Sequence, residues 1–295
     1  MGNHTGEFAA LATAFLWTIT ALSFEKAAKR IGSLAVNILR LSLALVFFCC
    51  LSIIRNGHLF PADIDLHGWI WLSVSGIIGF VLGDYCLFSA YALIGSRIAN
   101  LLMALAPPLA TLFGWLIVGE KFSLRGLLGM SITLIGIIIV VLRRPDNKFN
   151  FHYSTKGLLF GLGAAAGQAM GLVFSKFGMR DADPFTSSQI RVISGTIGFV
   201  LLFTILNKWS LLKPAFNRPS TLGFISTVSF FGPFLCVSFS LIAIKYTTTG
   251  IASTIMALVP VLLIPTAIIL LKEKVTWREI LGSLIAVCGV ALFFI

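Results

Sequence analysis

Long apolar stretches alternate with short polar connections along the whole chain. A helix that crosses a bilayer needs about 20 mostly apolar residues. Stretches of this length recur throughout, so the pattern predicts an all-helical membrane protein with short connections between antiparallel neighbours. Ten stretches qualify as transmembrane helices, at residues 7–26, 34–54, 68–87, 98–118, 124–142, 157–177, 185–206, 222–243, 249–271 and 277–295.

The longest polar stretch, RRPDNKFNFHYSTK, occupies residues 143–156 and contains four Lys and Arg. It has five predicted helices on each side. The pattern therefore predicts a first five-helix repeat at residues 1–142, a basic linker at residues 143–156 and a second five-helix repeat at residues 157–295.

An internal repeat supports this division. A shift of 153 positions lays residues 96–142 on residues 249–295 without a gap, and 14 of the 47 positions are then identical. The matches include Glu, Lys, Arg and Gly positions as well as Pro107 with Pro260, which an apolar bias alone would not align. Five helices is an odd number, so the second half enters the membrane from the opposite side. This predicts an inverted repeat with a substrate site between the halves, near the midplane of the membrane.

Composition indicates that lipid is the solvent. Hydrophobic residues make up 58% of the chain and charged residues only 11%, whereas soluble domains carry about a quarter charged residues. The net charge of +11 comes mainly from Lys and Arg between the apolar stretches. Such residues are typical of loops that touch anionic lipid heads, so we expect a bilayer and no nucleic acid as the partner.

The chain has no motif for enzyme chemistry. HExxH, GxSxG and P-loop patterns are missing, and the five cysteines form no CxxC pair. We therefore expect no enzyme activity, no cofactor and no metal site. An integral-membrane enzyme acting on lipid-like substrates is the alternative, and it would need clustered acids or His at a helix end.

Several segments resemble the drug/metabolite transporter superfamily, specifically its EamA-type members. They are FLWTITALSFEKAAK at residues 15–29, GDYCLFSAYALIG at residues 83–95, AIKYTTTGIAS at residues 243–253, and the two proline helices that each close with Glu-Lys. The resemblance covers essentially the whole chain. It implies ten helices around a central cavity, export as the commoner direction, and a small substrate such as an amino acid, a nucleoside or an amphipathic drug.

The membrane we expect is the cytoplasmic (inner) membrane of a prokaryote, and two orientations in it are open. Counting residues at the helix ends, fourteen of the 22 Lys and Arg lie in or beside odd-numbered connections. The positive-inside rule then places these connections in the cytoplasm and both termini outside. Members of the resembled family are usually drawn with both termini inside.

Asp84 is the sharpest single candidate for chemistry. It lies within an apolar run, without a nearby positive charge in sequence. A charged Asp at the bilayer centre costs at least about 2.5 kcal/mol. It should therefore face the cavity, pair with a basic group or hold a proton. One hypothesis is proton coupling or recognition of a substrate amine, and the other is a structural hydrogen bond. The acid is not duplicated, because its rough counterpart after Gly232 is Pro233.

Four further charged residues lie within or beside predicted helices. Arg40 and Arg191 each fall about two turns into a helix, and Glu25 lies at a depth similar to that of Arg40, which suggests a buried Glu25–Arg40 pair. In the second half the matching neighbour is Lys176. Lys176 and Arg191 at one depth would attract an anion such as a carboxylate. The alternative is that both side chains extend to the membrane interface.

Gln168 lies mid-helix in GLGAAAGQAMG, beside a row of glycines at Gly163, Gly167 and Gly171 that permits close helix packing. Its amide either faces the cavity or bonds across helices. Further candidate cavity-lining residues are Trp17, Tyr85 and Asn100.

Four prolines fall inside predicted helices: Pro107 and Pro108 in the first half, Pro260 and Pro265 in the second. A proline inside a helix removes a backbone donor and clashes with the carbonyl four residues earlier. In lipid the freed carbonyl needs a partner, so such helices usually face protein or a wet cavity. The two interpretations are a static kink and a helix that bends during gating.

A Glu-Lys pair follows the repeated proline in each half, at Glu120–Lys121 and Glu273–Lys274. Thirteen residues separate each Glu from its proline, which corresponds to about 20 Å of helix and reaches the interface. We expect these pairs to end one helix and start the next, with a direct substrate role as the alternative.

Together these features predict a secondary transporter that moves a small molecule by alternating access. Protons are the candidate coupling ion, with Asp84 as their carrier. A passive channel or facilitator is the other transport mode that the sequence allows.

Overall fold

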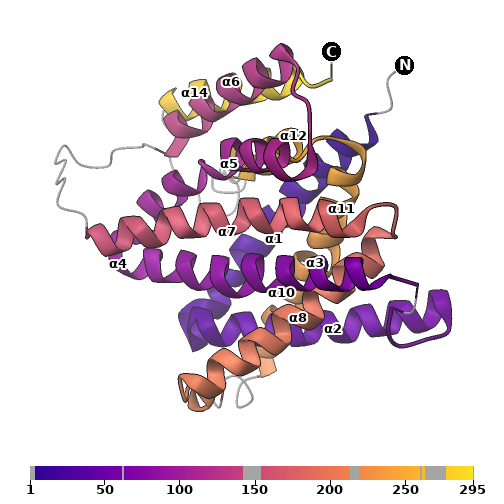
Figure 1. Ribbon diagram of the computed structural model, residues 1–295. Coiled ribbons are helices and arrows are strands. Elements are labelled where there is room, and N and C mark those ends of the chain that lie inside the picture. The colour runs from indigo at the N-terminus through magenta and orange to yellow at the C-terminus, as the bar shows by residue number, and fades with distance from the viewer. Residues whose placement is uncertain are drawn as a thin grey trace.

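The computed structural model describes residues 4–61, 63–141, 154–212, 219–259, 261–262 and 277–294. Across these ranges the regular structure is entirely helical, as the apolar pattern predicts (Figure 1). Five helices are long and apolar enough to cross a membrane, and three shorter apolar helices accompany them. The elements of the first half are α1 (Thr5–Ile31), α2 (Ser33–Asn56), α3 (Leu66–Gly76), η1 (Ile77–Gly83), α4 (Asp84–Met103), α5 (Ala106–Phe113), η2 (Gly114–Val118) and α6 (Leu124–Val141).

The second half has a similar order as far as it is described, with an added short segment, η3, and with the part that corresponds to α4 divided into two helices. Its elements are α7 (Thr155–Met179), α8 (Pro184–Ile205), η3 (Trp209–Leu212), α10 (Pro219–Ser229), η4 (Phe230–Cys236), α11 (Val237–Tyr246), α12 (Thr249–Met256) and α14 (Trp277–Ala291).

Two π-helical segments mark equivalent places in the halves. The segment η1 joins α3 to α4, and η4 joins α10 to α11. The shift of 153 that aligns the repeat maps Ile77–Gly83 onto Phe230–Cys236 residue for residue. Asp84 therefore corresponds to Val237, which corrects its rough assignment to Pro233. The acid remains unique to the first half, directly after a widened turn of a kind that often occurs at functional sites.

Pro107 and Pro108 lie in the first turn of a helix rather than in its middle, so the expectation of a mid-helix kink at these residues was wrong. The helix expected at residues 98–118 is divided, because α4 continues to Met103 and α5 begins at Ala106. Both prolines occupy the first turn of α5. The first four backbone N–H groups of a helix have no partner within it, so proline costs little there. Pro260 and Pro265 lie outside the described residues.

The first helix of each half packs against the other half. Helix α7 runs along α3, η1 and α4, while α1 runs along α10, η4 and α11. Glycine permits the closest approach. A Cβ atom at Gly167 would lie 2.9 Å from the Cα of Gly83, and one at Gly171 would lie 3.0 Å from the Cα of Gly79. The glycine row thus brings the backbones of the two halves into contact, as its spacing suggests.

The last helices of the halves, α6 and α14, pack against each other at one edge (Figure 1). A Cβ atom at Gly136 would lie 2.6 Å from the carbonyl oxygen of Gly282. The chain ends also meet, because the ring of Phe294 lies 5.4 Å from that of His4 and 5.3 Å from that of Phe8. Both ends of the described chain therefore lie on one side of the membrane, which we call the termini side.

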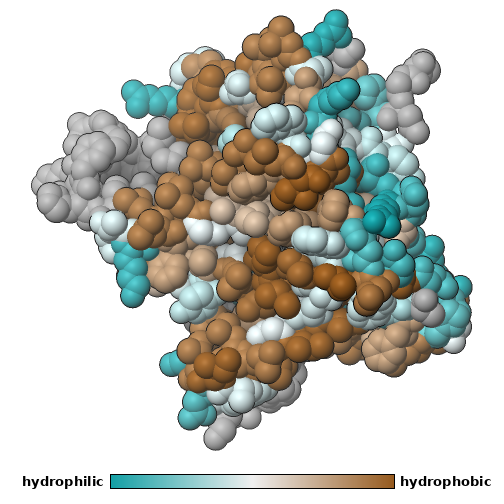
Figure 2. All heavy atoms as spheres, in the orientation of Figure 1, coloured by the Kyte–Doolittle hydropathy of each residue, from teal (hydrophilic) through white to brown (hydrophobic). Residues whose placement is uncertain are grey.

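The outer surface matches a lipid environment. Figure 2 shows brown, hydrophobic residues across the middle of one face, with teal residues gathered mainly toward the right edge and the upper and lower margins. Large apolar side chains such as Ile54 and Ile205 are about four-fifths exposed, at 81% and 79%. Contiguous apolar surface on this scale marks contact with lipid or with other proteins. The long helices α2 and α7 run between left and right in this orientation, so the polar right edge fits a region where helices leave the membrane.

Candidate functional site

An ion pair between Arg40 and Asp84 lies at the centre of the candidate site. Arg40 projects from α2, and Asp84 is the first residue of α4, directly after η1. Nη2 of Arg40 donates to Oδ2 of Asp84. Both residues are buried, at 4% and 5% exposed. A buried carboxylate without a partner would cost several kcal/mol, so Arg40 supplies the compensation that the sequence required of Asp84.

Gln168 joins this pair to the second half. Its Nε2 donates to Oδ1 of Asp84 at 3.2 Å. Gln168 lies near the middle of α7, which spans Thr155–Met179. At about 1.5 Å per residue, it is about 15–20 Å from either end of that helix. The Arg40–Asp84–Gln168 network therefore lies midway along the apolar helix α7 and spans the boundary between the halves.

Arg191 lies elsewhere in the interior. It projects from α8 and is 6% exposed. Its guanidinium carbon is 5.0 Å from the centroid of the Phe80 ring, a cation–π distance. Its Nε has no hydrogen-bond partner. The structure thus places Arg191 inside the protein rather than at the membrane interface.

A second polar cluster, centred on Glu120, lies toward the termini side. Gly119 adopts a left-handed conformation with φ of 72°, which ends η2 and turns the chain so that Glu120 is buried. Oε1 of Glu120 is 2.7 Å from Nζ of Lys176. Glu120 also accepts from the backbone N–H and the hydroxyl of Thr249, at 3.0 and 2.7 Å, at the start of α12. This carboxylate therefore ties η2 to α7 and to α12, across the boundary between the halves.

Glu7 and Thr247 form a further polar contact on the termini side. Oγ1 of Thr247 donates to Oε1 of Glu7 at 2.9 Å, which joins α1 to the end of α11. The backbone oxygen of Thr247 accepts from Nζ of Lys176 at 2.6 Å. Lys176 was expected to attract an anion together with Arg191, and in the structure it is already paired with an acid, Glu120.

A pocket of about 380 Å³ opens beside Lys176. It lies at the ends of α7 and α11, outside the Glu120–Lys176 pair. Three cations line it, against one acid. Its lining residues are Val118, Lys176, Phe177, Met179, Arg180, Asp181 and Lys245.

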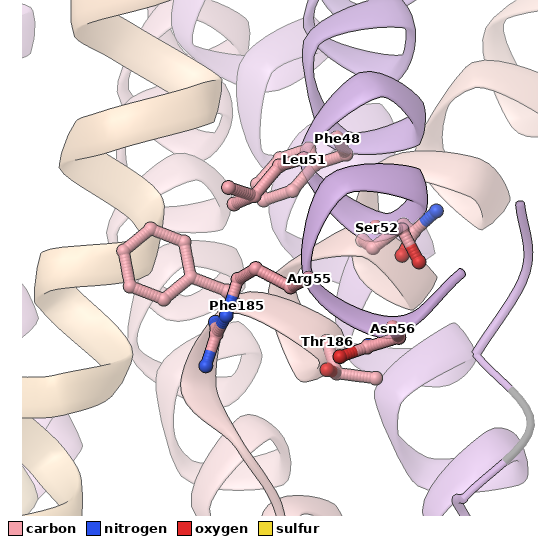
Figure 3. Close-up of a pocket in the computed structure, with 8 residues that line it drawn as sticks. Phe48, Leu51, Ser52, Arg55, Asn56, Phe185 and Thr186 are labelled. Atoms are coloured by element: carbon pink, nitrogen blue, oxygen red, sulfur yellow. The ribbon is translucent and has the colours of Figure 1, made fainter. Parts of the chain in front are cut away.

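A much smaller pocket lies between the end of α2 and the start of α8 (Figure 3). Its volume is about 10 Å³, room for about one water molecule. Arg55 and Phe185 flank it, with the Arg55 guanidinium carbon 5.7 Å from the Phe185 ring centroid. This pocket is too small for a substrate.

Of the other residues that the sequence suggested for the site, the structure describes some and not others. Trp17 is half-buried on α1, and Tyr85 packs edge-on against Phe160 of α7 at 6.2 Å. The structure does not describe the side chains of Glu25 and Asn100, so the Glu25–Arg40 pair stays a prediction. The second Glu-Lys pair, Glu273–Lys274, also lies outside the described residues.

Sequence reasoning gave too little weight to Glu120 and missed Thr249 and Asn37. The duplicated Glu-Lys suggested a helix end at the interface, whereas Glu120 is buried at 8% exposed. Thr249 lies in the TTT run that precedes α12. Asn37 is fully buried one turn before Arg40, and its amide has no hydrogen-bond partner. A polar residue one turn from Arg40 on the same helix face was the available signal.

The described helices, the two repeated halves and the buried charge network between them fit a membrane transporter of the drug/metabolite type. The chain belongs to the EamA-like transporter family, whose profile matches residues 4–142 and 155–295. This assignment agrees with the resemblance drawn from the sequence, and it favours a transporter over an enzyme.

Similar proteins carry transporter names. Solute carrier family 35 member G1 from Homo sapiens is 26% identical over 216 residues, which cover 70% of this chain but only 57% of the human protein. An uncharacterized transporter from Archaeoglobus fulgidus is 23% identical over 97% of this chain and 96% of its own length. One crystal structure superposes with a TM-score of 0.80 at 16% identity, over 99% of this chain and 97% of its own. At that identity the likeness shows the fold alone.

Proposed function

We propose that this chain is a secondary transporter that moves a small metabolite by alternating access, with export as its direction. The observation that carries the proposal is the Arg40–Asp84–Gln168 network, because it is buried, midway along the apolar helix α7 and shared between the halves. In transporters built from inverted repeats, substrate and coupling-ion sites lie near the midplane where the repeats meet. The substrate classes that the family suggests are amino acids, nucleosides and amphipathic drugs, and the membrane we propose is the prokaryotic cytoplasmic membrane.

Asp84 is the proposed proton carrier. Ionised, it pairs with Arg40 and accepts from Gln168. A proton on Asp84 would remove its negative charge and with it the ion pair. Loss of the charge would also weaken the hydrogen bond that Asp84 accepts from Gln168, which joins the two halves, and this weakening would couple protonation to their relative movement. A shift of population requires such a difference in interaction between the two states.

The Glu120 cluster is the proposed gate on the termini side. Opening there requires Glu120 to release Lys176 or Thr249, because these bonds connect η2 to α7 and α12. The break between α4 and α5, where Pro107 and Pro108 begin the new helix, is the proposed hinge of the first half.

Counterflow tests transport by this mechanism. The purified chain, reconstituted in liposomes loaded with one unlabelled compound, would be offered the same compound in labelled form outside. A panel of amino acids, nucleosides and cationic drugs would be screened. We expect saturable uptake with transient accumulation for at least one compound. Flux without accumulation or saturation would indicate a channel, and the alternating-access proposal would then be rejected.

A further inference from the structure

Arg191 carries a buried positive charge without an acidic partner. The residue is 6% exposed, and its side chain forms no ion pair with any residue that the structure describes. Nε has no hydrogen-bond partner. Among the described residues, its guanidinium contacts the face of the Phe80 ring, at 5.0 Å from the ring centroid. Cation–π contact contributes about 0.5–2 kcal/mol, which does not replace the hydration that a buried guanidinium loses.

The buried carboxylates Asp84 and Glu120 already have partners. Asp84 binds Arg40 and Gln168, and Glu120 binds Lys176 and Thr249. Each of these two carboxylates thus has its own cation. Arg191 leaves one uncompensated positive charge in the described interior. Ionisable residues in a membrane interior pair with one another or mark a substrate pathway.

Glycines pack against the guanidinium of Arg191. A Cβ atom at Gly79 would lie 3.5 Å from Nη2 of Arg191 and 3.7 Å from the Cα of Gly171. The guanidinium is thus next to a contact where two helices have no side chains. Along α7, Gly171 lies between Gln168 of the central network and Lys176 of the gate. Arg191 is therefore placed at a depth between the gate and the centre.

The entrance on the termini side has matching charge. The pocket outside the gate is lined by Lys176, Arg180 and Lys245, with Asp181 as the acid among its lining residues. Clefts lined by one sign of charge raise the local concentration of ligands of the opposite sign. A basic entrance followed by an unpaired arginine favours an anion and disfavours a cation.

We infer that Arg191 binds the carboxylate of the transported molecule, so that the substrate is a small organic anion. This inference rests on the proposed function. Arginine presents a rigid fork of donors that matches a carboxylate bidentately. Bound there, the carboxylate would supply the missing negative charge. Among the classes suggested above, the assignment favours carboxylate-bearing compounds over nucleosides and cationic drugs.

Melting temperatures test the assignment. The full chain would be purified into nanodiscs of phosphatidylcholine, which contain no anionic lipid. The probes are lactate, benzoate, succinate and amino acids, each compared with its amide. We expect at least one carboxylate to raise the melting temperature, because a ligand bound to the folded state stabilises it. The corresponding amide should have no effect.

Two variants separate binding from structure. Arg191→Met without ligand should melt above the wild type, because an unpaired buried charge is removed, and it should lose the carboxylate shift. Arg191→Lys keeps the charge without the fork and should bind about tenfold or more weakly. A carboxylate shift that survives in Arg191→Met, stabilisation by amides alone, or no carboxylate shift in the wild type would overturn the assignment.

Counterflow distinguishes this assignment from the proposed function. Accumulation of a nucleoside or a cationic drug, but of no carboxylate, would support the transporter proposal and overturn the assignment of Arg191 as a carboxylate site. Carboxylate binding through Arg191 without counterflow would leave the site standing and remove the transport mechanism. Accumulation of a carboxylate by the wild type, lost in Arg191→Met, supports both.

Discussion

Arg40 holds Asp84 in a region where water cannot solvate a carboxylate. The two residues are 44 positions apart in sequence, so no local pattern connects them. The sequence nevertheless required a partner for Asp84, because an isolated charge in the bilayer is costly. What it could not supply was which cation would meet Asp84, since that depends on how α2 and α4 pack. Gln168 illustrates the same limit, because both orientations of its amide fitted the sequence.

Loss of Arg40 should destabilise the protein through Asp84. Arg40→Met leaves a buried carboxylate unpaired, and breaking a buried pair in this way costs about 3–5 kcal/mol. The double variant Arg40→Met/Asp84→Leu removes both charges and should regain most of that loss. Thermal melting in detergent micelles would measure both. Arg55→Met is the matched control, because Arg55 pairs with Asp183 at the surface, where ion pairs contribute about 0–1 kcal/mol. An additive loss in the double variant would contradict the pairing.

Helices and their ends were predicted to different degrees. Apolar periodicity identified the long spans α2, α7 and α8 closely, because burial in lipid depends on composition and length. The break between α4 and α5 near Ala104 was not predicted, because the sequence stays apolar there. A proline in such a stretch fits a kink within a helix as well as the first turn of a new helix. The π segments η1 and η4 were also not predicted, because a widened helical turn does not change the hydropathy pattern of the sequence. Their spacing of 153 appears only when the two halves are compared.

Glu120 should control the stability of the gate at the start of α12. Glu120→Gln removes the ion pair with Lys176 and weakens the bonds to Thr249. We expect faster hydrogen exchange of the amides at the beginning of α12, because fewer bonds then hold this segment closed. Exchange in α8 should change little. Mass spectrometry of the purified chain would measure this. Lys121→Gln, an exposed neighbour, is the control. Equal exchange in both variants would show that Glu120 does not close the gate.

At the scale of the whole molecule, inverted halves interlock through their first helices, α1 and α7. Movement of one half against the other must therefore break contacts at the boundary, and the two polar networks lie there. The termini meet on the side closed by Glu120. In the sequence, fourteen of the 22 Lys and Arg lie in or beside the odd-numbered connections, which the predicted alternation of helices puts on the opposite side. The fold places the Glu120 gate on the same side as the termini, and the distribution of Lys and Arg determines which side of the membrane that is.

Orientation follows from that charge difference. The positive-inside rule predicts that both termini, and hence the Glu120 gate, face away from the cytoplasm. A C-terminal fusion to alkaline phosphatase, which is active only outside the cytoplasm, should therefore be active, and a fusion to a fluorescent protein that requires the cytoplasm should be dark. The reverse pattern would place the gate on the cytoplasmic side, in agreement with the orientation usually drawn for the family.

Proton-driven transport tests the role of the central network most directly. Liposomes containing the purified chain would be given a pH gradient, and accumulation of the compound identified by counterflow would be followed. We expect the gradient to accelerate transport by the wild type and by Asp63→Asn, a change of an exposed acid. Asp84→Asn should transport at one rate with or without the gradient, because its amide cannot carry the proton. Acceleration by the gradient that persists in Asp84→Asn would contradict the account.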